Sequence, residues 1–109
     1  MIMLKEFIEA IQKRDQALEI GNAKIANINY DKINAIRAIW EREGVDLKEL
    51  KFLLNHKEDA VRTMTAFVLL PILTDEAEQT LESIATKRGS VGFEAGMILK
   101  EWKKGNLKF

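Results

Sequence analysis

The chain contains no cysteine, which excludes disulfides, Cys-ligated zinc, iron–sulfur clusters and thiol catalysis. It also has no excess of charge of either sign, because 17 Lys and Arg side chains are balanced by 17 Asp and Glu. Proteins that bind phosphate backbones usually carry a basic excess. The charge balance therefore argues against nucleic acid as the partner.

Long apolar runs are absent as well. The longest covers residues 66–73 and contains Pro71, whereas a membrane-spanning helix needs about 20 apolar residues. Near the start of the chain, Glu6 and Glu9 interrupt the apolar residues, unlike the uninterrupted core of a secretory signal. We expect a cytoplasmic protein that makes no contact with membranes.

Residues that break helices are scarce, with one proline and six glycines in 109 residues. Apolar side chains recur at spacings of three and four, which is typical of amphipathic helices. The length suits one domain over residues 1–109. We predict six helices at about residues 2–20, 23–43, 46–54, 60–70, 75–88 and 90–104.

The spacing also predicts which side chains face inward. For the first two helices, the inward set comprises Leu4, Phe7, Ile8, Ile11 and Leu18, then Ile25, Ile28, Ile36, Ile39 and Trp40. Polar residues that precede the later helices are expected to cap their free amides, namely Asp46, Asn55, Asp75 and Ser90. The helix at 60–70 is apolar on nearly all sides, so we expect it in the middle of the molecule.

A weak internal repeat links the last four helices. Leu50 and Leu53 precede a turn and a helix with Ala66, and the spacing recurs, with a slip of one residue, in the pair that contains Ala95. Pairs of about 30 residues are the size at which helical repeats stack, because each amphipathic pair needs a neighbour to bury its inner face. We predict an all-α fold: a short right-handed stack of three antiparallel helix pairs.

The segment Asp59-Ala60-Val61-Arg62 resembles the opening of the second helix in HEAT-type repeats. The chain resembles most a small bacterial HEAT-like domain of unknown function. This resemblance rests on residues 21–32, on Val61-Arg62 with Ala66 and Leu70, and on Phe93-Glu94-Ala95 with Leu99, Trp102 and Gly105. Because that family is associated by gene neighbourhood with immunity proteins of toxin systems, the resemblance implies a non-enzymatic protein that binds and neutralises a toxin.

One candidate surface lies on the helix at 23–43. Asn27, Tyr30, Asp31 and Asn34 are spaced so that they share a face. Neutral hydrogen-bonding groups beside an aromatic ring suit a partner surface. The alternative is that the polar groups bond nearby backbone and the ring packs against them.

A second candidate surface is acidic. Asp75, Glu76, Glu78 and Glu82 precede any base on their helix. Acids commonly complement the positive end of a helix dipole, and a ridge of them also steers a basic partner such as a nuclease toxin. As an alternative function, nucleic-acid binding would need Lys24, Lys100, Lys103 and Lys104 on one concave surface.

No pattern predicts a catalytic centre. The single histidine, His56, lies in a turn and lacks an orienting partner or the spacing of a metal site. The glycines of residues 89–96 lack the Lys-Ser/Thr of a phosphate loop, so they predict a close helix crossing at Gly92 and Gly96. We therefore expect no catalytic residue, metal or cofactor, and a monomer or weak homodimer that binds another protein.

Overall fold

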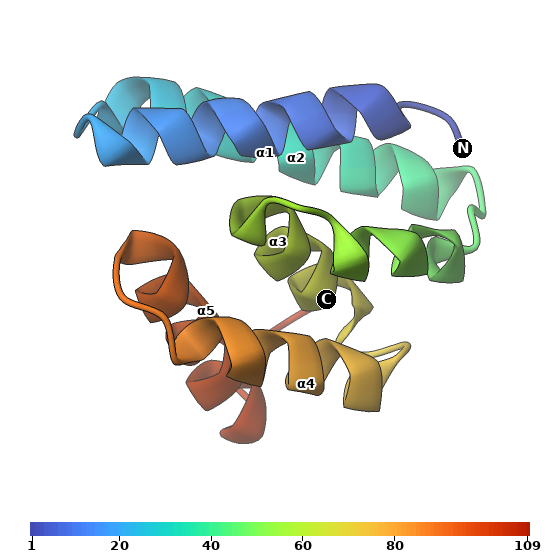
Figure 1. The fold of residues 1–109 in the computed structure, drawn as a ribbon. Coiled ribbons are helices and arrows are strands. Elements are labelled where there is room, and N and C mark those ends of the chain that lie inside the picture. Colours follow the sequence, from blue (N-terminus) through green and yellow to red (C-terminus); the bar gives the residue numbers. More distant parts are fainter. The chain divides into compact units, whose positions relative to one another are not determined.

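The structure, a computed structural model, describes all residues from 1 to 109 and contains helices but no strand. Five α-helices and one 3₁₀ helix follow in the order α1 (Leu4–Glu19), α2 (Ala23–Arg42), η1 (Leu47–Asn55), α3 (Asp59–Leu69), α4 (Thr74–Ala85) and α5 (Ser90–Lys103) (Figure 1). The prediction of an all-α fold with about six helices is confirmed.

The chain divides into two compact units, Met1–Glu49 and Leu50–Phe109. The first unit is the α1/α2 hairpin, which Figure 1 draws in blue and cyan. Gly21 ends α1 with φ +71°, and the Asn22 N–H donates to the Ala17 carbonyl at 2.8 Å, as in a Schellman turn. The Asn22 side chain then accepts from the Ile25 N–H at 3.1 Å and caps α2. Two residues therefore end one helix and start the next.

At the other end of the hairpin, Trp40 of α2 contacts residues at the start of the chain and in α1. Its ring is fully buried and lies 4.9 Å, centroid to centroid, from the ring of Phe7. Its Nε1–H donates to the Ile2 carbonyl at 2.6 Å. Because this bond sets residue 2 level with residue 40, Trp40 fixes the register of α1 against α2.

The inward face of α2 differs from the one that the spacing predicts. Ile33, Ile36 and Trp40 are buried, but Ile25 and Ile28 are 41% and 43% exposed. Leu18 of α1 was also expected inside and is 41% exposed. The reason is that α2 carries apolar residues around more than one stripe, and periodicity alone does not tell which stripe the partner helix covers.

Residues 47–55 form a 3₁₀ helix where an α-helix was predicted. Leu47, Leu50 and Leu53 are spaced by three, which matches the three residues per turn of a 3₁₀ helix and places them on one face. Leu50 and Leu53 are accordingly buried, while Phe52 is 58% exposed. Asp46 caps this segment, as predicted, by accepting from the Lys48 N–H at 3.1 Å.

The second unit packs α4 against both α3 and α5. α3 is buried on nearly all sides, including Thr63 and Thr65, as expected for a helix that is apolar on nearly all sides. At the chain end, the Phe109 ring packs against Phe67 in a tilted arrangement, with the centroids 5.2 Å apart, and meets Trp102 edge-on at 6.0 Å. These aromatic rings join the end of the chain to α3 and α5.

Three of the predicted caps are wrong. The residues that precede α3, α4 and α5 are Glu58, Leu73 and Gly89, and none of them makes a side-chain cap. Asp75 and Ser90 instead lie inside the first turns of their helices. At Asp75 the carboxylate still complements the positive end of the α4 dipole, which is why this position resembles a cap in the sequence.

Gly92 marks the predicted close approach within the second unit. A Cβ at this position would lie 2.9 Å from the Lys87 carbonyl carbon, closer still to its oxygen, and 3.2 Å from the Ile84 oxygen. Gly96 differs, because a Cβ there would meet only the Ala85 Cβ at 3.8 Å. The crossing therefore depends on one glycine, and the prediction that Gly96 shares this role is wrong.

Candidate functional site

The predicted polar face of α2 occurs on the outside of the hairpin. Asn27 and Asp31 are exposed, Tyr30 is 39% exposed and Asn34 is half-buried. α2 brings the four residues together because offsets of three, four and seven fall within one sector of a helix. The face therefore combines an aromatic ring with an anionic and two amide side chains.

Two arginines order this face. The Arg14 guanidinium of α1 lies over the Tyr30 ring, 5.4 Å from its centroid. On α2 itself, Arg37 donates through Nη1 to the Asn34 Oδ1 at 3.3 Å. Burial lowers the pKa of Arg37, yet an arginine keeps its proton at neutral pH, so the guanidinium remains a donor.

Only one of these two arginine contacts could have been predicted from the sequence. Arg37 follows Asn34 by three residues, a spacing at which helical side chains meet, so this pair could have been predicted. Arg14 belongs to a different helix, and only the register of the hairpin brings it to Tyr30. The ordering of the ring therefore depends on a tertiary contact.

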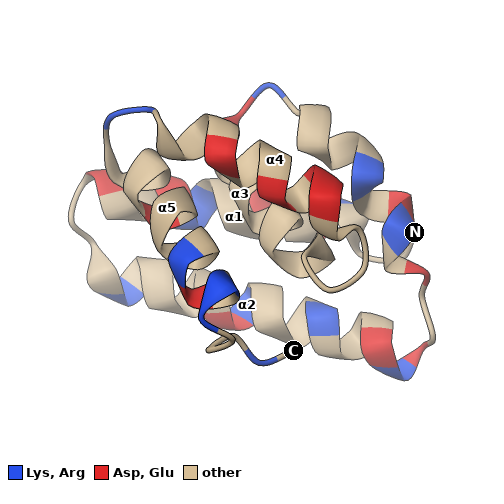
Figure 2. Cartoon of the chain, turned by 90° about the horizontal axis from the view of Figure 1, so that it is seen from below, with Lys and Arg blue, Asp and Glu red and all other residues tan.

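The predicted acidic residues lie along α4, where Figure 2 shows the acidic bands. Asp75 and Glu82 are exposed. Glu78 accepts from the Trp102 Nε1–H at 2.8 Å, and Glu76 lies 3.8 Å from the Lys51 ammonium. Glu78 thus takes part in the packing of its own unit, which leaves Asp75 and Glu82 as the acids most open to solvent.

A groove that the sequence did not predict runs between α1 and α2. Its volume is about 310 Å³, and its lining is mostly apolar. The lining residues are Met3, Glu6, Glu9, Ala10 and Lys13 of the α1 side, and Asn29, Lys32, Ala35, Ile36 and Ile39 of α2. Asn29 is buried and donates to the Ile25 carbonyl at 3.0 Å, but its Oδ1 has no hydrogen-bond partner. The groove is therefore an apolar channel with charged rims.

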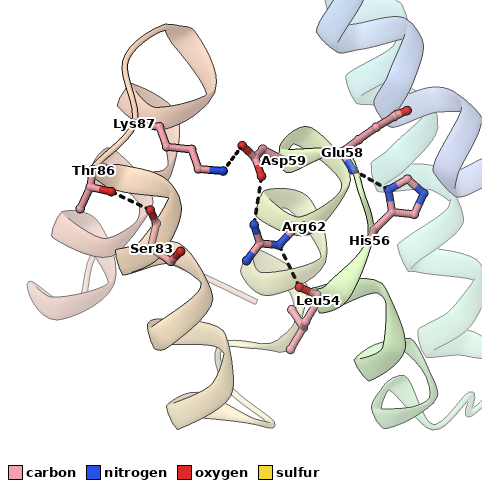
Figure 3. A network of polar contacts seen from close by, with 8 residues as sticks. All are labelled: Leu54, His56, Glu58, Asp59, Arg62, Ser83, Thr86 and Lys87. Carbon is pink, nitrogen blue, oxygen red and sulfur yellow. Dashed lines mark hydrogen bonds and ion pairs between the residues drawn. The ribbon is translucent and has the colours of Figure 1, made fainter.

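The segment that contains Asp59 and Arg62 forms a polar network in the second unit (Figure 3). The Asp59 carboxylate accepts from Arg62 Nη1 at 3.0 Å and from Lys87 Nζ at 2.7 Å. Arg62 also donates through Nε to the Leu54 carbonyl at 2.9 Å, at the end of η1. The hydrogen bond from Lys87 is the main reason that the pKa of Asp59 is lowered from its ordinary value.

His56 lies in the turn before α3, as predicted. Its Nδ1 accepts from the Glu58 N–H at 3.0 Å (Figure 3), so the ring helps to form the turn. No group of three or more His, Cys, Asp or Glu side chains could hold a metal ion. No helix combines the length and the hydropathy that crossing a membrane requires.

The lysines of the alternative function belong to different units. Lys24 lies at the start of α2 in the first unit, whereas Lys100 and Lys103 lie in the last turn of α5 and Lys104 follows it in the second. Comparisons with family models, with curated proteins and with solved structures gave no match. The resemblance to HEAT-like domains therefore stays a prediction from the residues.

Proposed function

We propose that the chain is a non-enzymatic protein-binding module, and that its most specific role is a HEAT-like immunity protein that covers the surface of a bacterial toxin. The observation that carries the binding role is the ordered polar face of α2. Tyr30 is exposed, and the Arg14 guanidinium lies over its ring, 5.4 Å from the ring centroid. The toxin is inferred from the family resemblance and not from this face.

Order matters for binding because a side chain that is fixed in advance loses little entropy when a partner arrives. A tyrosine contributes a large, rigid contact area together with one hydroxyl group. The exposed Asn27 and Asp31 beside it supply hydrogen bonds of both polarities. This combination favours a protein surface over a small metabolite as the ligand.

The acids of α4 suit a basic partner. Asp75 and Glu82 are exposed, and charges of this kind raise the rate of association more than the final affinity. A nuclease toxin, which carries cationic groups for nucleic acid, would be attracted to them. In this proposal, Tyr30 dominates the affinity and the α4 acids accelerate the encounter.

Affinity capture from the cells of origin tests the binding role. The tagged chain should retain a protein in stoichiometric amount, and Tyr30→Ala should weaken the purified complex about tenfold or more, as for a central aromatic contact. Glu19→Ala, at an exposed position near the end of α1, serves as the matched control and should bind normally. Binding that is equally strong for Tyr30→Ala would contradict the proposal, as would capture of no protein.

A growth assay tests the toxin role separately. Cells that express the captured protein alone should stop growing, and co-expression of the wild-type chain should restore growth. Tyr30→Ala should restore growth less well. In a separate binding measurement, Asp75→Asn combined with Glu82→Gln should lower the association rate with the captured protein and make that rate less sensitive to salt. A captured protein that is harmless to cells would refute neutralisation and leave the binding role standing.

A further inference from the structure

α2 carries a second apolar stripe that its own hairpin leaves open. Lys32, Ala35 and Ile39 line the groove, and Ile25 and Ile28 continue the same flank toward the start of the helix. These five positions follow one another at intervals of three, four, three and four. That is the a/d spacing of a helix that packs along another helix. The stripe therefore has the pattern of an unfilled helix–helix seam.

Around Lys32 the apolar residues are arranged symmetrically. Ile28 and Ile36 lie four residues before and after it, and Ile25 and Ile39 lie seven residues before and after it. If a second α2 lies antiparallel across the first with the two Lys32 residues level, Ile25 meets Ile39 of the other copy. Ile28 then comes level with Ile36, which is 3% exposed and lines the groove. A surface that is complementary to itself in this way is what a two-fold dimer requires.

The rims of the groove add charge complementarity. The bond between Trp40 and Ile2 sets residue 2 of the chain level with residue 40, so Glu9 lies level with residue 33, beside Lys32. In the symmetric pairing, Lys32 of each copy therefore comes to Glu9 of the other. Within its own chain, Glu9 has only a 3.9 Å contact with the exposed Lys5.

Lys13, one turn further along the same wall, comes level with Ala35 of the other copy and not with its Lys32. From the open stripe, its symmetry and these charges, we propose that the α1/α2 groove binds α2 of a second copy and forms an antiparallel homodimer. This inference does not rest on the proposed function, because the polar face around Tyr30 lies on another sector of α2.

Sedimentation equilibrium tests the dimer directly. A contact at the small end of interface sizes associates weakly, so the concentration should span about 1 µM to about 1 mM. The wild-type chain should show a monomer–dimer equilibrium, and Ile28→Lys should raise the dissociation constant more than about tenfold. Phe93→Lys is the matched control, because Phe93 is 71% exposed on α5 and should leave the equilibrium unchanged.

Charge reversal tests the symmetry of the pairing. Lys32→Glu and Glu9→Lys should each weaken the dimer, since each places like charges together across the interface. An equimolar mixture of the two variants should dimerise again, because every reversed charge then faces its opposite. Such a rescue would also show that both variants are folded, because misfolded chains would not dimerise when they are mixed.

Each alternative outcome overturns the proposal. A wild-type chain that remains monomeric throughout the series excludes the second copy as the occupant. A dimer that tolerates Ile28→Lys uses another surface, and a mixture that remains monomeric refutes the antiparallel register. If the chain is monomeric but Ile28→Lys abolishes capture of the partner protein, the groove belongs to that partner.

Discussion

Two glycines one turn apart in α5 should respond in opposite ways to the same substitution. At Gly92, an added methyl group would overlap the Lys87 carbonyl and lie 3.2 Å from the Ile84 oxygen. At Gly96, it would touch only the Ala85 Cβ at an ordinary 3.8 Å. Both glycines lie on α5, Gly92 in its first turn and Gly96 in its interior, and the two variants differ mainly in what packs against the added methyl group.

The magnitude follows from two opposing terms. Replacing glycine by alanine inside a helix stabilises it by about 1 kcal/mol. Overpacking costs about 1–3 kcal/mol and sometimes more, and at Gly92 the cost lies at or above the upper end because the obstacle is backbone. We therefore expect Gly92→Ala to lower the free energy of unfolding by about 2–3 kcal/mol and Gly96→Ala to raise it by about 0.5–1 kcal/mol.

Urea unfolding followed by far-ultraviolet circular dichroism measures these differences. Thermal unfolding gives a second reading, in which about 1 kcal/mol corresponds to about 4 °C for a chain of this size. Tryptophan fluorescence can be followed in both units, because Trp102 lies in the unit that contains both glycines and Trp40 lies in the other. If Gly92→Ala is as stable as the wild type, or if both variants lose stability equally, the close approach at Gly92 is wrong.

Four further substitutions test individual side chains. Asp59→Asn should lower the free energy of unfolding by about 1–2 kcal/mol at neutral pH. Because the pKa of Asp59 is lowered in the folded protein, the Asp59 carboxylate stabilises the fold fully above about pH 4. This stabilisation disappears as the pH falls through the folded pKa. Urea unfolding at a series of pH values should therefore show the free energies of unfolding of the wild type and Asp59→Asn converging in acid. Trp40→Phe keeps a ring but removes the bond to Ile2, and calorimetry should show a loss of about 2–3 kcal/mol. Thr63→Val and Thr65→Val each remove a buried hydroxyl without a partner, so each should preserve stability or raise it by about 1 kcal/mol in urea, and a loss would show that the hydroxyl is satisfied.

Local signals predicted the helices well. The apolar spacing and the Gly21-Asn22 pair placed α1 and α2 within about two residues of their observed ends. The 3₁₀ form of η1 was missed, although the spacing of Leu47, Leu50 and Leu53 contained it. The error arose because Leu54, which is also buried, adds an interval of four from Leu50, so the segment carries the spacing of an α-helix as well.

Contacts between helices were harder to predict. Asp59 and Arg62 lie three residues apart, a spacing at which helical side chains meet, but Lys87, 28 residues from Asp59, completes their network and could not be assigned from spacing. Likewise, Tyr30 and Asn34 were predicted to share a face, while Arg14, which orders the ring, comes from the other helix. In both cases the residue that was not predicted reaches the site only through the way in which two helices pack against each other.

The two isoleucines that were wrongly placed inside explain why the groove was missed. Ile25 and Ile28 belong to one apolar stripe of α2, and Ile33 and Trp40 belong to another. Periodicity detects both stripes and counts them as one broad face. A hairpin partner can cover only one, so the width of the face itself indicates that α2 needs a second neighbour. An apolar sector wider than one helix can bury is therefore the observation on which the proposed second copy rests, and Ile25, Ile28 and Ile39 are the residues that it would cover.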